Sequence, residues 1–243
     1  DAGGTIHSAV RDISFRLGKG ECLGLIGESG SGKSVTALSL MGLVASPPGV
    51  ITSGAVYIDG TDVLALREQE LIGLRGARVA YVFQDPLTTL HPLFAVGEQV
   101  AEAILAHDPV GRQAAHARAV ALMETVGIRD AASRAGAYPH ELSGGQRQRI
   151  GIAMALANDP DIIIADEPTT ALDVTVQARI LELLHDLRRE RGLALLLITH
   201  DFGVVAQVCD RVAVMKDGAI VEQGETRAIL RAPRHDYTKR LIA

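Results

Sequence analysis

The chain has 243 residues, 47% of them hydrophobic and 22% charged, so it is long enough for one large domain or two smaller lobes. Its net charge of −5 gives no overall electrostatic reason to expect nucleic acid as a partner, although a local basic face stays compatible. The longest apolar run, LALLLI at 193–198, is too short for a bilayer-crossing helix and is typical of a strand.

The two chain ends and the two cysteines indicate whether the chain is part of a longer protein and in which compartment it works. It begins without Met, shows no signal-peptide pattern and stops at KRLIA without turn residues, so we expect a piece of a longer protein. Cys22 and Cys209 are far apart and lack CxxC or Cys/His spacing, which indicates neither a metal site nor a disulfide framework. A reducing cytoplasm is the simpler expectation.

Short apolar runs alternate with helical patterns along much of the chain. The strand and helix pairs are 22–27 with 34–44, 161–166 with 174–190, and 193–200 with 201–212. This alternation predicts an α/β fold with a mainly parallel sheet and helices on its faces.

Other segments depart from this alternation. AVRDISFRL at 9–17 and AVYIDGTDV at 55–63 are typical of half-buried antiparallel strands. A polar, Ala-rich stretch at about 97–140 predicts a helical lobe. Residues 212–224 predict a hairpin turned by Asp217 and Gly218.

The segment GESGSGKS at 27–34 lies between a predicted strand and a predicted helix and fits the pattern GxxxxGK[ST]. Glycines let successive backbone N–H groups point at phosphate oxygens, at the positive end of the following helix. Lys33 would balance β- and γ-phosphate charge, and the Ser34 hydroxyl would hold Mg²⁺. The alternative is a flexible Gly/Ser turn. The expected nucleotide-binding residues here are Gly27, Glu28, Ser29, Gly30, Ser31, Gly32, Lys33, Ser34 and Val35.

Two adjacent carboxylates end the apolar run DIIIADEP at 161–168. Asp166 is expected to reach Mg²⁺ through water. Glu167 is expected to point the other way along the strand and to polarise the attacking water. The alternative is a strand that merely ends in solvated acids before Pro168.

A second candidate anion site lies in ELSGGQRQRIGIAMALA at 141–157. Ser143, Gly144 and Gly145 come just before an amphipathic helical pattern, and a helix N-terminus suits an anion. The local alternative is an ordinary Ser N-cap with glycines in the turn.

Four motifs, GESGSGKS, LSGGQ, IIIADEPTTALD and LLLITHD, together resemble the nucleotide-binding domain of ATP-binding cassette (ABC) transporters, and the resemblance covers essentially the whole chain. It implies an ATPase that binds ATP and Mg²⁺ and works as a head-to-tail pair. Each ATP would lie between the phosphate loop of one half and the LSGGQ segment of the other. The implied lobes are a core with an antiparallel β lobe at about 1–84 and 155–243, and a helical lobe at about 85–154.

The resemblance also assigns residues that their local patterns leave open. It implies that Gln84 contacts Mg²⁺ and the water and links to the lobe that meets the membrane partner. His200 resembles the histidine that contacts the γ-phosphate, and Gln146 belongs to the second anion site. Asp173 resembles the aspartate that acts across the dimer. Its local alternative is a helix N-cap, and the two roles are compatible.

One feature departs from the family pattern. The family stacks adenine on an aromatic residue about twenty residues before the phosphate loop, but GGTIHSAV at 3–10 has none. Two alternatives stay open for the adenine contact: either Ile6 or His7 packs on the base, or the aromatic residue precedes this sequence.

Three segments resemble the dipeptide and oligopeptide importer branch of the family, which includes relatives that import nickel or glutathione. They are 46–66, 81–100 and 231–243, the last with a Tyr-Thr pair in the closing helix. The implied partners are a second nucleotide-binding domain (same chain, homologue or identical copy), two transmembrane permease subunits and an extracytoplasmic substrate-binding protein. The implied location is peripheral, at the cytoplasmic face of the cell membrane.

Two alternatives use the same ATP chemistry. A soluble ABC ATPase acting on chromosomes, DNA repair or ribosomes would usually carry long coiled coils, zinc inserts or basic arms, and the sequence shows none of these patterns. An exporter cassette is disfavoured by DPLTTLHP at 85–92, and a fused membrane domain in the full gene would favour it.

Overall fold

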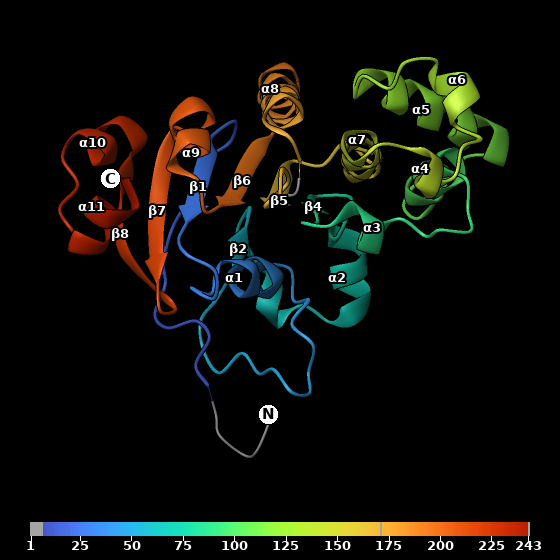
Figure 1. Cartoon of the computed structure of the whole chain (residues 1–243). Coiled ribbons are helices and arrows are strands. Elements are labelled where there is room, and N and C mark those ends of the chain that lie inside the picture. The colour runs from blue at the N-terminus through green and yellow to red at the C-terminus, as the bar shows by residue number, and fades with distance from the viewer. Residues whose placement is uncertain (1–6, 171, 243) are drawn as a thin grey trace. The chain divides into compact units, whose positions relative to one another are not determined.

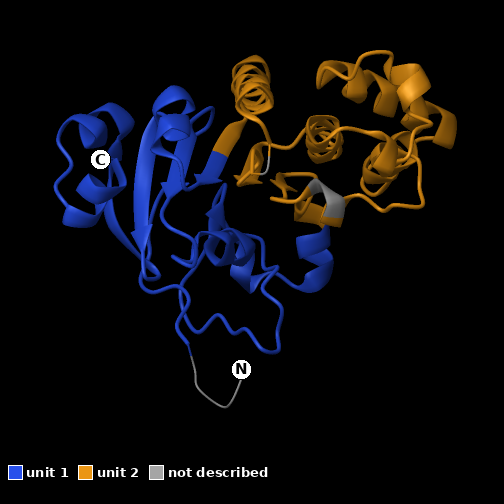
Figure 2. Ribbon diagram, viewed as in Figure 1, with its two compact units in different colours: residues 1–72, 196–243 blue, residues 73–195 orange. Residues whose placement is uncertain are grey.

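A computed structural model describes residues 7–170 and 172–242, and the chain divides into two compact units. Unit 1 comprises residues 1–72 and 196–243, and unit 2 comprises residues 73–195 (Figure 2). Both combine strands and helices (Figure 1). The lobe boundaries expected near residues 84 and 154 stay a prediction.

Unit 1 is built on strands β1 (Cys22–Ile26), β7 (Arg211–Lys216) and β8 (Ala219–Glu225). β1 runs parallel to β7, with Leu23 opposite Arg211, and β8 returns antiparallel to β7. Every residue of β1 is buried, as expected of a strand covered on both faces. The predicted hairpin is confirmed. Its turn residues Asp217 and Gly218 have φ values of 48° and 82°, the left-handed values that such a turn requires.

Unit 1 also contains helices. They are α1 (Lys33–Leu40), the 3₁₀ helix η1 (Val63–Ala65), α9 (Phe202–Val208), α10 (Thr226–Arg231) and α11 (Asp236–Ile242). α9 contacts β1, and α10 contacts β8 and α9. Gly24 in β1 favours the close approach of α9, because a Cβ there would lie 3.1 Å from the Cys209 sulfur and from a Val205 methyl carbon, which is a tight contact. Two elements cross from one unit to the other along the chain: α2 (Glu68–Leu74) and β6 (Ala194–Thr199).

The two segments expected to form antiparallel strands behave differently. Residues 55–63 contain the short antiparallel pair β2 (Tyr57–Ile58) and β3 (Thr61–Asp62), which confirms the antiparallel prediction there. Residues 9–17 form no strand, so the second prediction is wrong. Asp12 adopts a left-handed φ of 44°, which bends the chain and interrupts the extended backbone that a strand needs.

Unit 2 contains the parallel strands β4 (Val79–Val82) and β5 (Ile162–Asp166), with Val79 opposite Ile162. Its helices are α3 (Pro86–Thr89), α4 (Val96–Leu105), α5 (Arg112–Thr125), α6 (Ala131–Arg134), the 3₁₀ helix η2 (Pro139–Glu141), α7 (Gly144–Ala155) and α8 (Val174–Arg191). α4 packs against α5 and α7, and α7 also contacts β4 and α8. The fully buried Ile104, Met123 and Ile150 mark this core.

The predicted strand and helix alternation is confirmed with small shifts. The helix predicted at 201–212 ends at Val208, because residues 211–216 belong to β7. The apolar run at 193–198 contributes to strand β6, as predicted. Over residues 7–170 and 172–242, no helix combines the length and apolar character that a membrane crossing requires.

Candidate nucleotide-binding site

The phosphate loop joins β1 to α1 within unit 1, in the strand–loop–helix order that the motif predicts. Gly30 and Gly32 have φ values of 81° and 101°, which favour glycine. Gly27 is required for a different reason. A Cβ on it would lie 2.2 Å from the backbone oxygen of Met215 in β7, so any larger residue would displace one of the two chains. The loop is therefore held tightly against the neighbouring strand.

Lys33 lies inside this loop with only 4% of its surface exposed. Its Nζ donates hydrogen bonds to the carbonyl oxygens of Gly27, at 2.7 Å, and Glu28, at 2.9 Å. The hydroxyl of Ser31 is buried without a hydrogen-bond partner among the described residues. A positive charge and a buried hydroxyl within a glycine-rich loop at a helix N-terminus suit a phosphate group.

Asp166 ends strand β5 in unit 2 and is 5% exposed. Its Oδ2 accepts a hydrogen bond of 2.8 Å from the hydroxyl of Tyr81, while its Oδ1 is buried with no hydrogen-bond partner in the described part of the chain. Burial and the Asp166 charge raise the pKa of Tyr81, which keeps the phenol protonated as a donor. Sequence reasoning missed Tyr81, because only the pairing of β4 with β5 brings it near the carboxylate.

Glu167 follows β5 in a left-handed conformation with φ of 45°. Strand β5 ends at Asp166, so Glu167 lies just beyond the strand, and the expectation that its side chain points away from that of Asp166 stays a prediction. Its Oε2 accepts hydrogen bonds from the Gln84 side-chain amide, at 3.3 Å, and from the Thr170 hydroxyl, at 2.8 Å. The structure thus brings Gln84 and Glu167 together. Thr170, which sequence reasoning missed, could have been found as a hydroxyl three residues after a carboxylate in a turn.

The LSGGQ segment begins helix α7 in unit 2. Ser143 is its N-cap: its Oγ accepts a 3.3 Å hydrogen bond from the Gln146 amide, and the Gln146 side chain accepts one of 2.9 Å from the Ser143 amide. This reciprocal pair is a capping box. A Cβ on Gly145 would lie 2.5 Å from a methyl carbon of Val176, so this glycine permits the approach of α8. The local N-cap interpretation is correct, and the nucleotide role stays a prediction.

The remaining predicted site residues lie at element ends. Asp173 caps α8, with its Oδ1 accepting a 3.0 Å hydrogen bond from the Val176 amide. His200 is exposed between β6 and α9 in unit 1. Of the two adenine candidates, His7 is exposed and Ile6 lies outside the described residues.

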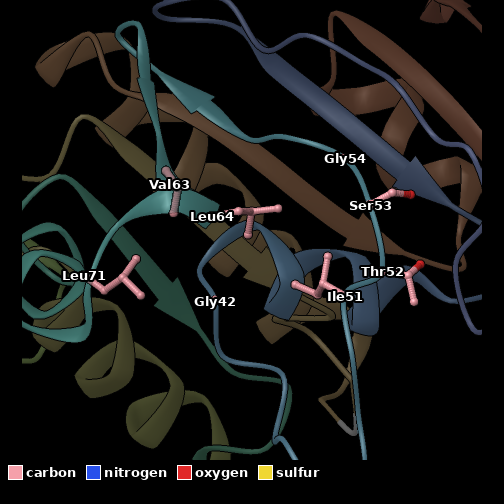
Figure 3. A pocket seen from close by; sticks show the side chains of 8 residues that line it. All are labelled: Gly42, Ile51, Thr52, Ser53, Gly54, Val63, Leu64 and Leu71. Carbon is pink, nitrogen blue, oxygen red and sulfur yellow. The ribbon is translucent and has the colours of Figure 1, made fainter.

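Unit 1 also contains an open hollow of about 380 Å³, which is not lined by the phosphate loop. Figure 3 shows its lining: Gly42, Ile51, Thr52, Ser53, Gly54, Val63, Leu64 and Leu71. These residues offer apolar side chains, two hydroxyls and no charged group, and none is a predicted site residue. The hollow therefore lacks the cationic chemistry of a triphosphate site.

A P-loop nucleotide hydrolase requires two parts, a phosphate loop such as the one around Lys33 and carboxylates such as Asp166 and Glu167 at the end of β5. Residues 10–170 match the family described as ABC transporter. The chain is 50% identical over 241 residues to the oligopeptide transport ATP-binding protein OppD of Bacillus subtilis, covering 99% of this chain and 67% of that protein. It is also 50% identical over 240 residues to the dipeptide transport ATP-binding protein DppD of the same organism, covering 99% and 71%.

Solved structures agree in fold. A dimeric post-hydrolysis state of the ATP-binding cassette MJ0796 bound to ADP and phosphate matches with a TM-score of 0.81 and 32% identity, covering 93% of this chain and 94% of that one. A second dimeric structure of the same cassette gives 0.80. This chain belongs to the ABC transporter family, as an ATP-hydrolysing cassette of the ABC ATPase fold.

Proposed function

We propose that this chain powers an importer of dipeptides or oligopeptides. The observation that carries the proposal is 50% identity, across 99% of the chain, to proteins named for oligopeptide and dipeptide transport. The segments 46–66, 81–100 and 231–243 support the same branch through their sequence patterns.

The phosphate loop is the proposed binding site for the ATP triphosphate. Lys33 already points its ammonium group into the loop, held by the carbonyl oxygens of Gly27 and Glu28. Backbone amides of residues 29–35 and the positive end of α1 would add to the attraction for phosphate. The protein thereby offers a fixed set of donors that stabilise charge on the transferring phosphoryl group.

The residues present fit a magnesium ion bound with the nucleotide. Asp166 offers a buried carboxylate oxygen without a hydrogen-bond partner among the described residues, and Ser34 and Gln84 would add neutral oxygen ligands. Mg²⁺ usually takes one or two protein carboxylates and otherwise binds water and phosphate, so a single Asp is sufficient. When bound, the ion neutralises charge on the β- and γ-phosphates.

Glu167 is the proposed residue that orients and polarises the attacking water. Gln84 and Thr170 both donate hydrogen bonds to its Oε2, which restricts the orientation of the carboxylate. His200, at the carboxyl end of β6, would contact the γ-phosphate. In this proposal the phosphate loop binds the triphosphate and Glu167 positions the attacking water.

A second cassette would complete each site. We propose that the capped N-terminus of α7, with Ser143, Gly144, Gly145 and Gln146, contacts the γ-phosphate held by the opposite cassette. Asp173 would act across the same interface. ATP would close this pair and hydrolysis would reopen it, so the cycle yields a motion that membrane subunits can use.

The proposed partners are two permease subunits, at the cytoplasmic membrane face, and a substrate-binding protein outside. The segment after Gln84 supports a protein partner there, because Leu93 is 75% exposed and Phe94 52% exposed. The buried Gln99 holds this segment in place. Its side chain accepts a hydrogen bond from the His91 amide and donates to the carbonyl oxygens of His91 and Phe94. Apolar side chains presented on a fixed loop are typical of an interaction surface.

The cargo can be tested with the full-length protein assembled with its permease subunits in liposomes. Candidate binding proteins, each loaded with one solute, are added outside while ATP turnover is measured inside. We expect a peptide-loaded binding protein to raise turnover, and nickel- or glutathione-loaded ones to leave it at the basal rate. Stimulation by nickel or glutathione alone would contradict peptide import.

A further inference from the structure

The phosphate loop is braced from outside by the C-terminal part of unit 1. The amide of Gly218, in the β7–β8 turn, donates a 2.9 Å hydrogen bond to the carbonyl oxygen of Ser31. The amide of Glu28 donates one of 3.0 Å to the hydroxyl of Tyr237, more than two hundred residues further along the chain. Residues from the far end of the sequence therefore hold two peptide groups of the loop.

Tyr237 lies in helix α11 and is only 3% exposed. Its ring lies beneath two cations, with Lys216 Nζ 5.5 Å and Arg240 Cζ 6.0 Å from the ring centre. Burial raises the pKa of Tyr237, and the nearby Glu28 carboxylate adds to this; together they outweigh the lowering by the hydrogen bond from the Glu28 amide, so the phenol stays protonated at neutral pH. The ring is thus packed firmly while its hydroxyl meets the loop.

Helix α11 is itself anchored to strand β8. The carboxylate of Glu222 accepts hydrogen bonds from the amides of Arg234, at 2.8 Å, and His235, at 3.0 Å, just before the helix begins. This fixes the start of α11 and with it the position of Tyr237. A continuous path therefore runs from β8 through α11 to the phosphate loop.

We propose that Tyr237 is a positioning residue for nucleotide binding, through which helix α11 fixes the Gly27–Glu28 peptide group of the phosphate loop. The peptide group that joins Gly27 to Glu28 is held on both sides, its N–H by the Tyr237 hydroxyl and its carbonyl oxygen, that of Gly27, by the Lys33 ammonium. Releasing the N–H lets this peptide rotate, and the rotation moves a carbonyl that orients the Lys33 ammonium. The triphosphate then meets a less organised set of donors and binds more weakly.

This inference gives a physical role to Tyr237, the first residue of the Tyr-Thr pair in the closing helix. A phenylalanine would fill the same buried space and keep both cations over its ring, but it offers no acceptor to Glu28. The inference rests on the proposed nucleotide role of the phosphate loop and is independent of the transported solute.

The test compares the wild type, Tyr237→Phe, Tyr57→Phe and Lys33→Ala in the full-length protein assembled with its partner subunits. Tyr57 is the matched control, because it is 70% exposed on β2. We measure ATP and ADP dissociation constants, KM and kcat for ATP, and the melting temperature without nucleotide. For Tyr237→Phe we expect both dissociation constants and KM to rise about threefold to tenfold. Its kcat at saturating ATP and its melting temperature should match those of the wild type.

Three outcomes would overturn the inference. Tyr237→Phe with wild-type dissociation constants and KM excludes a positioning role. If the melting temperature falls and kcat decreases by the same factor as the ATP affinity, Tyr237 stabilises the fold in general and has no specific positioning role. An equal effect of Tyr57→Phe removes its specificity. Lys33→Ala tests the phosphate site independently of Tyr237. Retained ATP affinity in that variant would contradict the proposed nucleotide role of the loop rather than the role of Tyr237.

Discussion

At the scale of single residues, the most informative feature is the backbone at Glu167. A non-glycine residue with a φ of 45° is uncommon, and such strain occurs often at catalytic sites. In this conformation, Gln84 and Thr170 both donate hydrogen bonds to one oxygen of the Glu167 carboxylate. The strained turn is therefore consistent with a carboxylate placed for chemistry rather than a solvated strand end.

Glu167→Gln should leave ATP binding intact and lower ATP turnover by at least about 100-fold, because the amide removes the proton-accepting group at the water position. Trapped ATP should also hold the paired cassettes together. Turnover in the full-length protein with its partners and the elution volume with ATP check both expectations. Glu182→Gln, an exposed carboxylate on α8, is the control. An unchanged ATPase rate for Glu167→Gln would remove Glu167 from this role.

At the scale of elements, the sequence was most informative where one local pattern decides the structure. The buried strands, the phosphate loop and the Asp217–Gly218 hairpin each follow from neighbouring residues. Residues 9–17 were mispredicted, because a strand also needs a partner and the left-handed Asp12 breaks the alternation. The contacts of Tyr81 and Tyr237 were unpredictable, since each joins residues brought together only by strand pairing or by the C-terminal fold.

The anchoring of α11 by Glu222 gives a pH-dependent prediction. Burial raises the pKa of Glu222, but hydrogen bonds from the Thr238 side chain and from the amides of Arg234 and His235, with the charge of His235, outweigh it and leave the pKa below its ordinary value of 4.5. Because the native pKa is the lower one, the carboxylate stabilises the fold above the unfolded-state pKa. This contribution is lost as pH falls through the native pKa.

We therefore expect Glu222→Gln to lower the free energy of unfolding at pH 7 by about 1 kcal/mol, with the difference from wild type closing as the pH falls below 4.5. Denaturant unfolding of both proteins, from pH 7 to below pH 4.5, measures this difference in free energy. Glu225 is exposed on the same strand, and Glu225→Gln should change neither the free energy of unfolding at pH 7 nor its dependence on pH. A difference that persists undiminished at the acidic end would show that the carboxylate charge is not involved.

At the scale of the whole molecule, the predicted site residues are divided between the two compact units. Lys33 and His200 lie in unit 1, whereas Gln84, Ser143, Asp166, Glu167 and Asp173 lie in unit 2. The dimeric state of the related cassette bound to ADP and phosphate shows that such folds pair with nucleotide present. Pairing would give every chain two separate tasks, one at the nucleotide it holds and one at the nucleotide of its partner.

The most direct test of this account is the structure of the full-length Glu167→Gln protein, assembled with its partners and loaded with ATP and Mg²⁺. We predict two bound ATP molecules. Lys33 of this chain should contact the phosphates of one, and Ser143 of this chain should contact the γ-phosphate of the other, whether the second cassette is identical or homologous. Lys33 and Ser143 of one chain on the same ATP, or Ser143 distant from any nucleotide, would contradict the paired-site mechanism.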